Sequence, residues 1–136
     1  RRCTRKELRN LSEDEALRIL KRRYVEANGI NRLDRLPIQA QLVDDAVLSG
    51  PYIAIQDLQK ALGTVTVDGI CGPETTRACV DAADDLPVRL AVIRALRLAR
   101  HVTKNPDQLC YLNGWLSRAL SFAHATKTPL SGLSEH

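Results

Sequence analysis

One stretch in the middle of the chain limits the possible folds more than any other. Residues 58–76 read LQKALGTVTVDGICGPETT and join two helix patterns. Leu58, Ala61 and Leu62 have the i, i+3, i+4 spacing of an apolar helix face, and Gly63 can adopt the left-handed conformation that ends a helix. The first part of the stretch therefore predicts the end of an amphipathic helix.

The second part of the stretch predicts a turn followed by another helix. Residues 65–70 alternate apolar and polar side chains toward Asp68-Gly69, a favoured turn dipeptide, and form the only strand candidate in the chain. Gly72-Pro73 then begins a helix, because proline suits the first helical position, where its missing N–H would have no partner. The positions that define this motif are Gly63, Asp68, Gly69, Gly72, Pro73 and Thr75.

Helix-start signals recur along the rest of the chain. Residues 12–15, SEDE, form a capping box, and Asn28-Gly29 can end the helix that follows. Proline or asparagine-proline begins the remaining apolar patterns. The expected helices begin near residue 13, at 37, 51, 73 and 87, and near 106, the last running to about 125. We therefore expect an all-α protein, one domain of about six helices with a short hairpin-like link at 65–70.

Composition sets outer limits on the chain. A length of 136 residues and a hydrophobic share of 44% suit one folded domain, and no apolar run approaches the ~20 residues of a membrane-spanning helix. The net charge of +4 is ordinary for a soluble domain. Residues 126–136 are predicted to form a flexible tail, and the start at Arg1 without methionine indicates that a natural N-terminus precedes it.

Cysteine and histidine spacing argues against a metal or redox centre. Cys3, Cys71, Cys79 and Cys110 contain no CxxC pair, which disfavours a zinc ribbon or a thioredoxin-like site. Unpaired structural thiols are preferred to a disulfide, which stays possible. No histidine has a partner at metal-ligand spacing, so we expect neither a metal nor a cofactor.

The central motif resembles small helical modules that bind bacterial peptidoglycan. Together with residues 4–27, 36–50 and 94–120, it resembles the later parts of the phage-type N-acetylmuramidases of glycoside hydrolase family 108. The resemblance implies a lysozyme-like helical domain at 1–125, with a peptidoglycan-binding-like segment at about 51–125. It also implies peptidoglycan as the partner, a bacterial or phage origin, and action at the periplasm or cell wall.

The resemblance places the catalytic acid outside this chain. In those muramidases the acid glutamate lies in a Glu-Gly-Gly segment near the N-terminus, which is absent here, and the match begins around Thr4. We therefore expect no catalytic residue in this chain, which alone should bind rather than cut. Two departures affect the expected sugar contacts: Tyr24 is followed by Val25 instead of tryptophan, and Leu48 replaces the asparagine of an Asn-Ser-Gly series.

The candidate substrate-binding residues are Tyr24, Asp44, Ser49, Gly50 and Trp115. Aromatic faces suit sugar rings, and a glycine permits close approach of the backbone. Asp44 and Asp45 diverge by about 100° on a helix, so they cannot both face one sugar. A structural role is the preferred interpretation of Asp44, with groove lining as its alternative, and a core position is preferred for Trp115, with the cleft as its alternative.

A basic stripe gives a further hypothesis. It consists of Arg89, Arg94, Arg97, Arg100 and His101, predicted to form one helix face. A solvated face is the preferred interpretation, and contact with phosphate-bearing wall polymer or nucleic acid is the alternative.

Three functions follow. The first is the C-terminal part of a peptidoglycan muramidase, and the second is a non-catalytic peptidoglycan-binding or structural module. The third is a small basic DNA-binding protein, disfavoured because the glycine-rich link does not resemble a helix-turn-helix turn. A monomer is the default.

Overall fold

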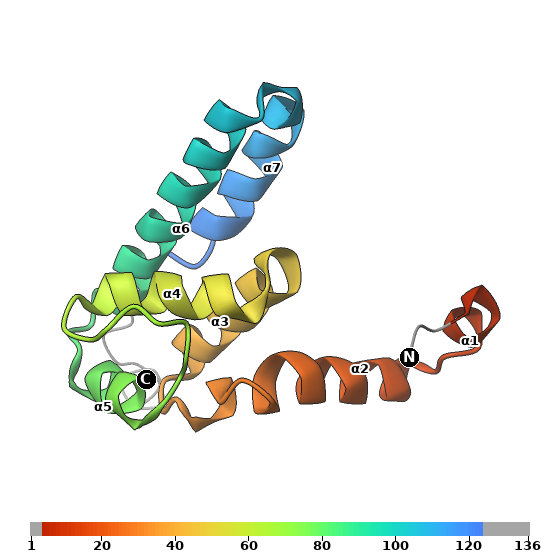
Figure 1. Ribbon diagram of the computed structural model, residues 1–136, viewed down its shortest axis with the longest axis horizontal. Helices are drawn as coiled ribbons and strands as arrows, with labels where there is room; N and C mark the ends of the chain where they lie inside the picture. Colours follow the sequence, from red (N-terminus) through yellow and green to blue (C-terminus); the bar gives the residue numbers. More distant parts are fainter. Residues whose placement is uncertain (1–3, 124–136) are drawn as a thin grey trace, which may run out of the picture.

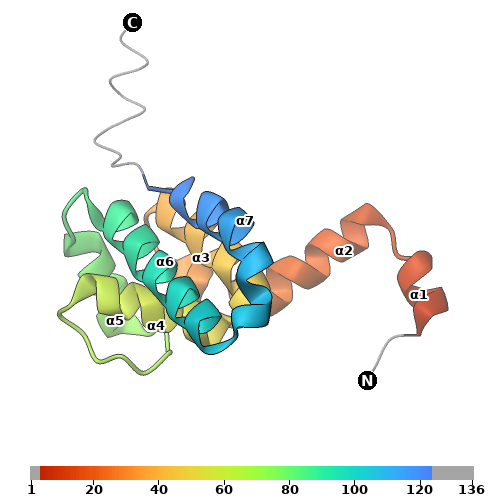
Figure 2. The same cartoon turned by 90° about the horizontal axis from the view of Figure 1, so that it is seen from above.

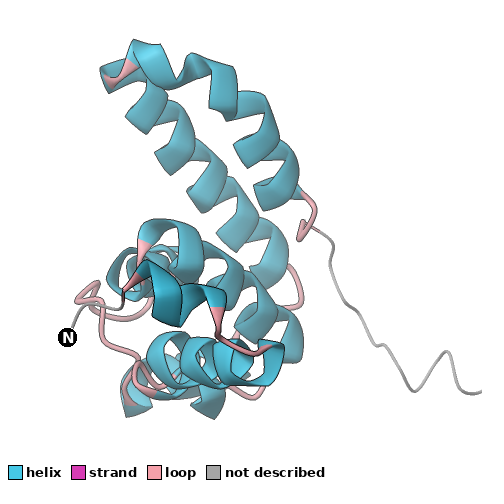
Figure 3. Ribbon diagram, turned by 90° about the vertical axis from the view of Figure 1, so that its right-hand side faces the viewer, coloured by secondary structure: helices cyan, strands magenta, loops and turns pink. Residues whose placement is uncertain are grey.

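The computed structural model describes residues 4–123, and this part of the chain is all-α (Figure 1). No strand occurs within it, as the colouring by secondary structure makes clear (Figure 3). The α-helices are α1 (Arg5–Arg9), α2 (Glu13–Leu20), α3 (Leu36–Ser49), α4 (Pro51–Leu62), α5 (Pro73–Asp81), α6 (Leu86–Lys104) and α7 (Leu109–Leu120). The predicted fold class is confirmed.

The predicted start and stop signals work as expected. The Ser12 hydroxyl accepts a hydrogen bond from the Glu15 amide, and the Glu15 carboxylate accepts one from the Ser12 amide. Pro37, Pro51, Pro73 and Pro87 all lie in the first turns of helices, as the sequence pattern predicts. Gly63 ends α4 with a φ of 71°, a backbone conformation that favours glycine.

Four helices form the body of the molecule. Helix α3 packs against α4, α4 packs against α6, and α6 forms an antiparallel hairpin with α7 (Figures 1 and 3). The core runs from residues 30 and 33 through α3 and α4 to the start of α6. Its buried members are Ile30, Leu33, Ile38, Leu42, Ala46, Ala54, Ile55, Leu58, Ala61, Leu62, Cys71, Cys79, Leu86 and Leu90.

The N-terminal helices project from this body. Helices α1 and α2 extend to one side of the other helices (Figure 2), and neither contains a buried residue. The apolar side chains of Leu17, Ile19 and Leu20 in α2 are exposed. Beyond α2 the chain widens into a π-helical turn, Lys21–Glu26, where Tyr24 and Val25 pack against the core. The N-terminal helical segment thus reaches the core only near its C-terminal end.

A buried amide organises the link between α4 and α5. Gln59 is 1% exposed, and its Oε1 accepts hydrogen bonds from the amides of Asp68 (3.0 Å) and Gly69 (2.9 Å). Its Nε2 lies within hydrogen-bond distance of Asp68 Oδ1, Ile70 O and Thr75 Oγ1 (2.8, 3.0 and 3.1 Å). One side chain on α4 therefore holds both the turn and the beginning of α5.

This arrangement corrects the expected hairpin-like strand segment at 65–70. The segment forms no strand, because its turn amides bond to the Gln59 side chain instead of to a neighbouring strand. Val65 packs against the core, whereas Val67 is exposed. The turn itself is as predicted: Gly69 has a φ of 75°, and a Cβ at this position would collide with the ring of Tyr52. Only glycine fits this site without rearrangement.

Two further boundaries differ from the sequence prediction. A short helix, α1, precedes the capping box, and Thr4 caps it with a second capping box. The helix expected from residue 106 begins as a 3₁₀ turn, Pro106–Gln108, and α7 ends at Leu120.

Cys71, Cys79 and Cys110 are free thiols, and burial raises the pKa of Cys79 to about 11. The predicted tail at 126–136 lies outside the described residues.

Replacing Gln59 with leucine tests the role of this amide. The Gln59→Leu variant loses every hydrogen bond from the amide, so we expect the free energy of unfolding to fall by about 2–3 kcal/mol. Urea unfolding followed by circular dichroism measures the change, and limited proteolysis measures exposure of residues 63–72. Gln56→Leu, a half-buried position on the same helix, is the matched control. Equal stability of the two variants would contradict the role assigned to Gln59.

Candidate functional site

A cleft opens where the α3–α4 corner meets the α6–α7 hairpin. Its volume is about 390 Å³. It is lined by Leu48, Ser49, Ile53, Arg94, Arg97, Leu98, His101, Gln108 and Trp115. Apolar, aromatic and cationic side chains thus meet in one concave site, the composition expected of a pocket for a polar ligand with apolar faces.

An ion-pair network lies beneath the cleft and joins four helices. Arg97 of α6 contacts both carboxylate oxygens of Asp45 on α3 (2.7 Å each) and Asp57 Oδ2 on α4 (2.7 Å). Arg94 contacts Asp44 Oδ2 at 2.8 Å and Asp45 Oδ1 at 3.3 Å. Arg118 of α7 donates to Asp44 Oδ1 at 2.6 Å. Three carboxylates therefore face three guanidinium groups.

The pKa values of two carboxylates in the network, Asp57 and Asp44, are shifted in opposite directions. Burial favours the neutral form of Asp57 and raises its pKa, even though Arg97 opposes this effect. Burial acts on Asp44 in the same direction, but hydrogen bonds from Arg118 and Arg94 outweigh it and lower its pKa. Asp44 is therefore held as an ionised partner of two arginines.

Arg94 carries donors without hydrogen-bond partners. It is 2% exposed, and its Nε and Nη1 atoms form no hydrogen bond with any described residue, although Nε lies 3.3 Å from Asp45 Oδ1. A buried guanidinium donor without an acceptor is costly, and an acceptor oxygen reaches the covered Nη1 only when neighbouring side chains move. The three carboxylates and three guanidinium groups of the network carry equal and opposite charge. A neutral carbonyl or hydroxyl oxygen therefore suits this donor better than a further carboxylate does.

Aromatic rings form one wall of the cleft. Trp115 is half-buried, and its ring lies 5.6 Å from that of Tyr111 in a stacked arrangement. The ring of His101 is 6.1 Å from Trp115, and its Nε2 lies 2.8 Å from Gln108 Oε1. Trp115 lies outside the hydrophobic core, so it is a cleft residue in this fold.

The structure brings together only some of the residues predicted to bind substrate. Ser49 and Trp115 both line the cleft, and the Ser49 hydroxyl accepts a hydrogen bond from Arg97 Nη1 at 3.1 Å. Gly50 forms the adjoining α3–α4 corner with a φ of 93°. Tyr24 packs against the core from the π-helical turn, and Asp44 belongs to the ion network beneath the cleft.

The predicted solvated basic stripe is wrong for Arg94 and Arg97, whereas the Arg89 side chain is 40% exposed. Arg94 is buried in the network, and Arg97 is largely committed to Asp45 and Asp57. Arg89 donates to the Ala61 carbonyl (2.9 Å) and lies 3.3 Å from Asp85. The physical reason is that α3 and α4 supply carboxylates opposite this helix face, a pairing between distant segments that helix periodicity cannot predict.

A larger hollow, about 770 Å³, lies between the end of α4, α5 and the start of α6. Its acids are Glu74 and Asp81, and no aromatic side chain lines it. Arg89, one of its cations, is already committed to Ala61 and Asp85. Size alone therefore does not make it the better candidate.

Residues 4–123 contain no group of three or more His, Cys, Asp or Glu side chains placed to hold a metal ion. Within the same part of the chain, no helix combines the length and the apolarity needed to span a bilayer.

Comparisons with known proteins find a family model and a solved structure that are similar to this chain. A family model described as "Predicted Peptidoglycan domain" matches residues 53–120, which span most of the cleft lining. The chain is also similar to the structure of Brucella abortus SagA, with a TM-score of 0.67 and 26% sequence identity over 94% of this chain and 75% of that one. No curated protein matches the chain by sequence.

Asparagine in place of Asp45 tests the network. The Asp45→Asn variant leaves two buried arginines short of negative charge, so we expect the free energy of unfolding to fall by about 3–5 kcal/mol. Urea unfolding measures the effect, with Asp81→Asn, an exposed carboxylate, as the control. A loss no larger than that of the control would show that the network does not hold the four helices together.

Proposed function

Because the chain belongs to the predicted peptidoglycan domain family, we propose that it binds the glycan strand of peptidoglycan in the cleft between the α3–α4 corner and the α6–α7 hairpin. The observation that carries the proposal is the presence of Trp115 and of Arg94, whose Nη1 has no partner, in the lining of one cleft. An aromatic face and a fixed donor together match an N-acetylated sugar.

Each side chain has a definite task in this proposal. The face of Trp115 packs on the apolar face of a sugar ring. Arg94 Nη1 donates to the carbonyl oxygen of the acetamido group, which is neutral and therefore compatible with the balanced network. Ser49 lines the same space, and Gly50 follows it at the α3–α4 corner.

The more specific part of the proposal concerns catalysis. The complete protein would be a phage-type N-acetylmuramidase of glycoside hydrolase family 108, cleaving the β-1,4 bond after N-acetylmuramic acid. Its catalytic glutamate would lie upstream of Arg1. The state of the three carboxylates beneath the cleft supports this assignment, because none of them suits the role of the acid. Asp44, Asp45 and Asp57 are all paired with arginine, so none is available to protonate a leaving oxygen.

Two alternatives differ from this proposal in measurable ways. A non-catalytic peptidoglycan-binding module would use the same cleft without any upstream glutamate. A DNA-binding protein would use the basic stripe of α6, and the burial of Arg94 and the pairing of Arg97 with carboxylates remove two cations from that stripe. A DNA mobility shift at physiological ionic strength, without binding to purified peptidoglycan, would favour the DNA-binding alternative.

Alanine at position 115 tests the glycan cleft. We expect Trp115→Ala to weaken binding to purified peptidoglycan by about fivefold to tenfold, because it removes the stacking surface. Sedimentation with the insoluble wall measures binding. Leu109→Ala removes an exposed apolar side chain from the same helix outside the cleft and is the control. Equal binding by the two variants would contradict the assignment of glycan binding to this cleft.

Turbidity separates binding from cutting. We expect the 136-residue chain to bind purified peptidoglycan without reducing its turbidity, because its cleft contains no free carboxylic acid. A longer product that includes an upstream Glu-Gly-Gly segment should clear the suspension. Clearing by the 136-residue chain would refute the claim that it contains no catalytic acid. Failure of the longer product to clear the suspension would favour the non-catalytic module.

A further inference from the structure

A second hollow lies on the other side of α6 and continues from the cleft. It has a volume of about 330 Å³ and lies between α4 and α6. Arg97 and His101 line both this groove and the cleft. A ligand bound in the cleft can therefore extend around α6 into the groove without leaving the protein surface.

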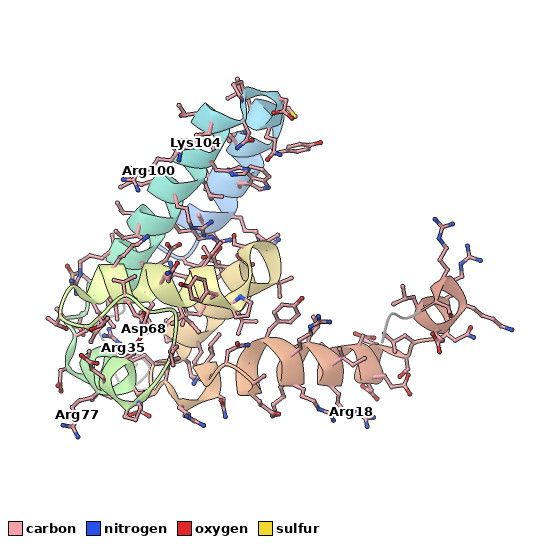
Figure 4. All side chains as sticks on the ribbon, in the orientation of Figure 1. Arg18, Arg35, Asp68, Arg77, Arg100 and Lys104 are labelled. Atoms are coloured by element: carbon pink, nitrogen blue, oxygen red, sulfur yellow. The ribbon has the colours of Figure 1, made fainter. Side chains whose placement is uncertain are left out.

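The groove carries cations that the fold does not neutralise. Lys60 of α4 and Arg100 and Lys104 of α6 line it, and none forms a hydrogen bond or ion pair with any described residue, although the charge of Lys60 acts to lower the pKa of Asp57. Figure 4 shows Arg100 and Lys104 projecting from the same region of α6. The one acid in the lining, Asp57, is bound to Arg97 at 2.7 Å. The groove is therefore positively charged overall.

Apolar side chains lie among these cations. Ile93 is half-buried and Leu96 is 47% exposed, and both line the groove. A ligand that suits this surface carries separated negative charges with small apolar groups between them. The stem peptides of peptidoglycan have this chemistry, because free carboxylates alternate with alanine methyl groups. A phosphodiester wall polymer supplies the charges without the apolar groups.

We propose that the groove between α4 and α6 binds the carboxylates of peptidoglycan stem peptides through Lys60, Arg100 and Lys104. This inference rests on the proposed glycan binding in the neighbouring cleft and adds the peptide part of the ligand. Arg97 and His101 join the two subsites, so a sugar in the cleft and its attached peptide in the groove are recognised together.

The test uses purified peptidoglycan from which phosphate polymers have been extracted with acid. Half of the sample is treated with carbodiimide and methylamine, which convert its carboxylates to neutral methylamides. We expect the wild-type chain to bind the amidated material about tenfold more weakly at low salt. The Arg100→Glu/Lys104→Glu double variant should bind both materials weakly, and the untreated material no better than the amidated one, because the introduced glutamates repel the stem-peptide carboxylates.

A matched control separates the groove from total charge. Arg9→Glu/Arg18→Glu makes the same change in net charge on α1 and α2, away from the groove, and Figure 4 places Arg18 on the projecting helix. It should bind like the wild type. The thermal midpoint of every variant is measured, so that a loss of binding is compared only among folded proteins.

The outcomes distinguish this inference from the proposed function. Wild-type binding that is unchanged by amidation, with Trp115→Ala still impaired, would overturn the peptide subsite and leave the glycan cleft intact. Wild-type binding to neither material and not to unextracted wall would overturn the glycan cleft as well. Binding to unextracted wall that is lost on acid extraction would assign the groove to a phosphodiester polymer and overturn the stem-peptide inference.

Discussion

The pairing of three buried or nearly buried carboxylates with three arginines is the constraint on which the rest of the structure depends. Arg97 ties α6 to both α3 and α4, while Asp44 ties α3 to α6 and α7. Breaking such a pair leaves an uncompensated charge away from water, which costs far more than an exposed ion pair contributes. The network therefore holds the α6–α7 hairpin at one position against α3 and α4, and the cleft exists because of that position.

This arrangement separates support from recognition along one helix. The α6 face toward α3 and α4 uses its arginines for structure, whereas Arg100 and Lys104 face solvent. Trp115 approaches the cleft from α7, and Lys60 approaches the groove from α4. A second polar centre, Gln59, fixes the link between α4 and α5 in the same body. Peptidoglycan recognition, as proposed, would draw on surfaces that these two centres hold in place.

Part of the candidate site could be predicted from sequence, and part could not. Ser49 and Trp115 were identifiable because hydroxyl and aromatic residues suit sugar contacts, and they meet in one cleft. Arg94 and Arg97 were assigned to a solvated face because helix periodicity describes one helix alone. Their carboxylate partners lie about 40–50 positions away in the chain, and only packing of α3 and α4 against α6 brings them together. The pair Asp44-Asp45 on an apolar helix was the available signal, because such carboxylates need partners when buried.

The sequence by itself determined the helical class, most helix boundaries and the turn at Asp68-Gly69. These features depend on local chemistry: proline at helix starts, capping boxes, and glycine where φ is positive. The tertiary structure decided that residues 65–70 form a loop instead of a strand pair, that Gln59 is its anchor, and which cations of α6 remain free. Each of these outcomes depends on which distant polar group satisfies a buried donor or charge, and that pairing becomes defined only when the helices pack.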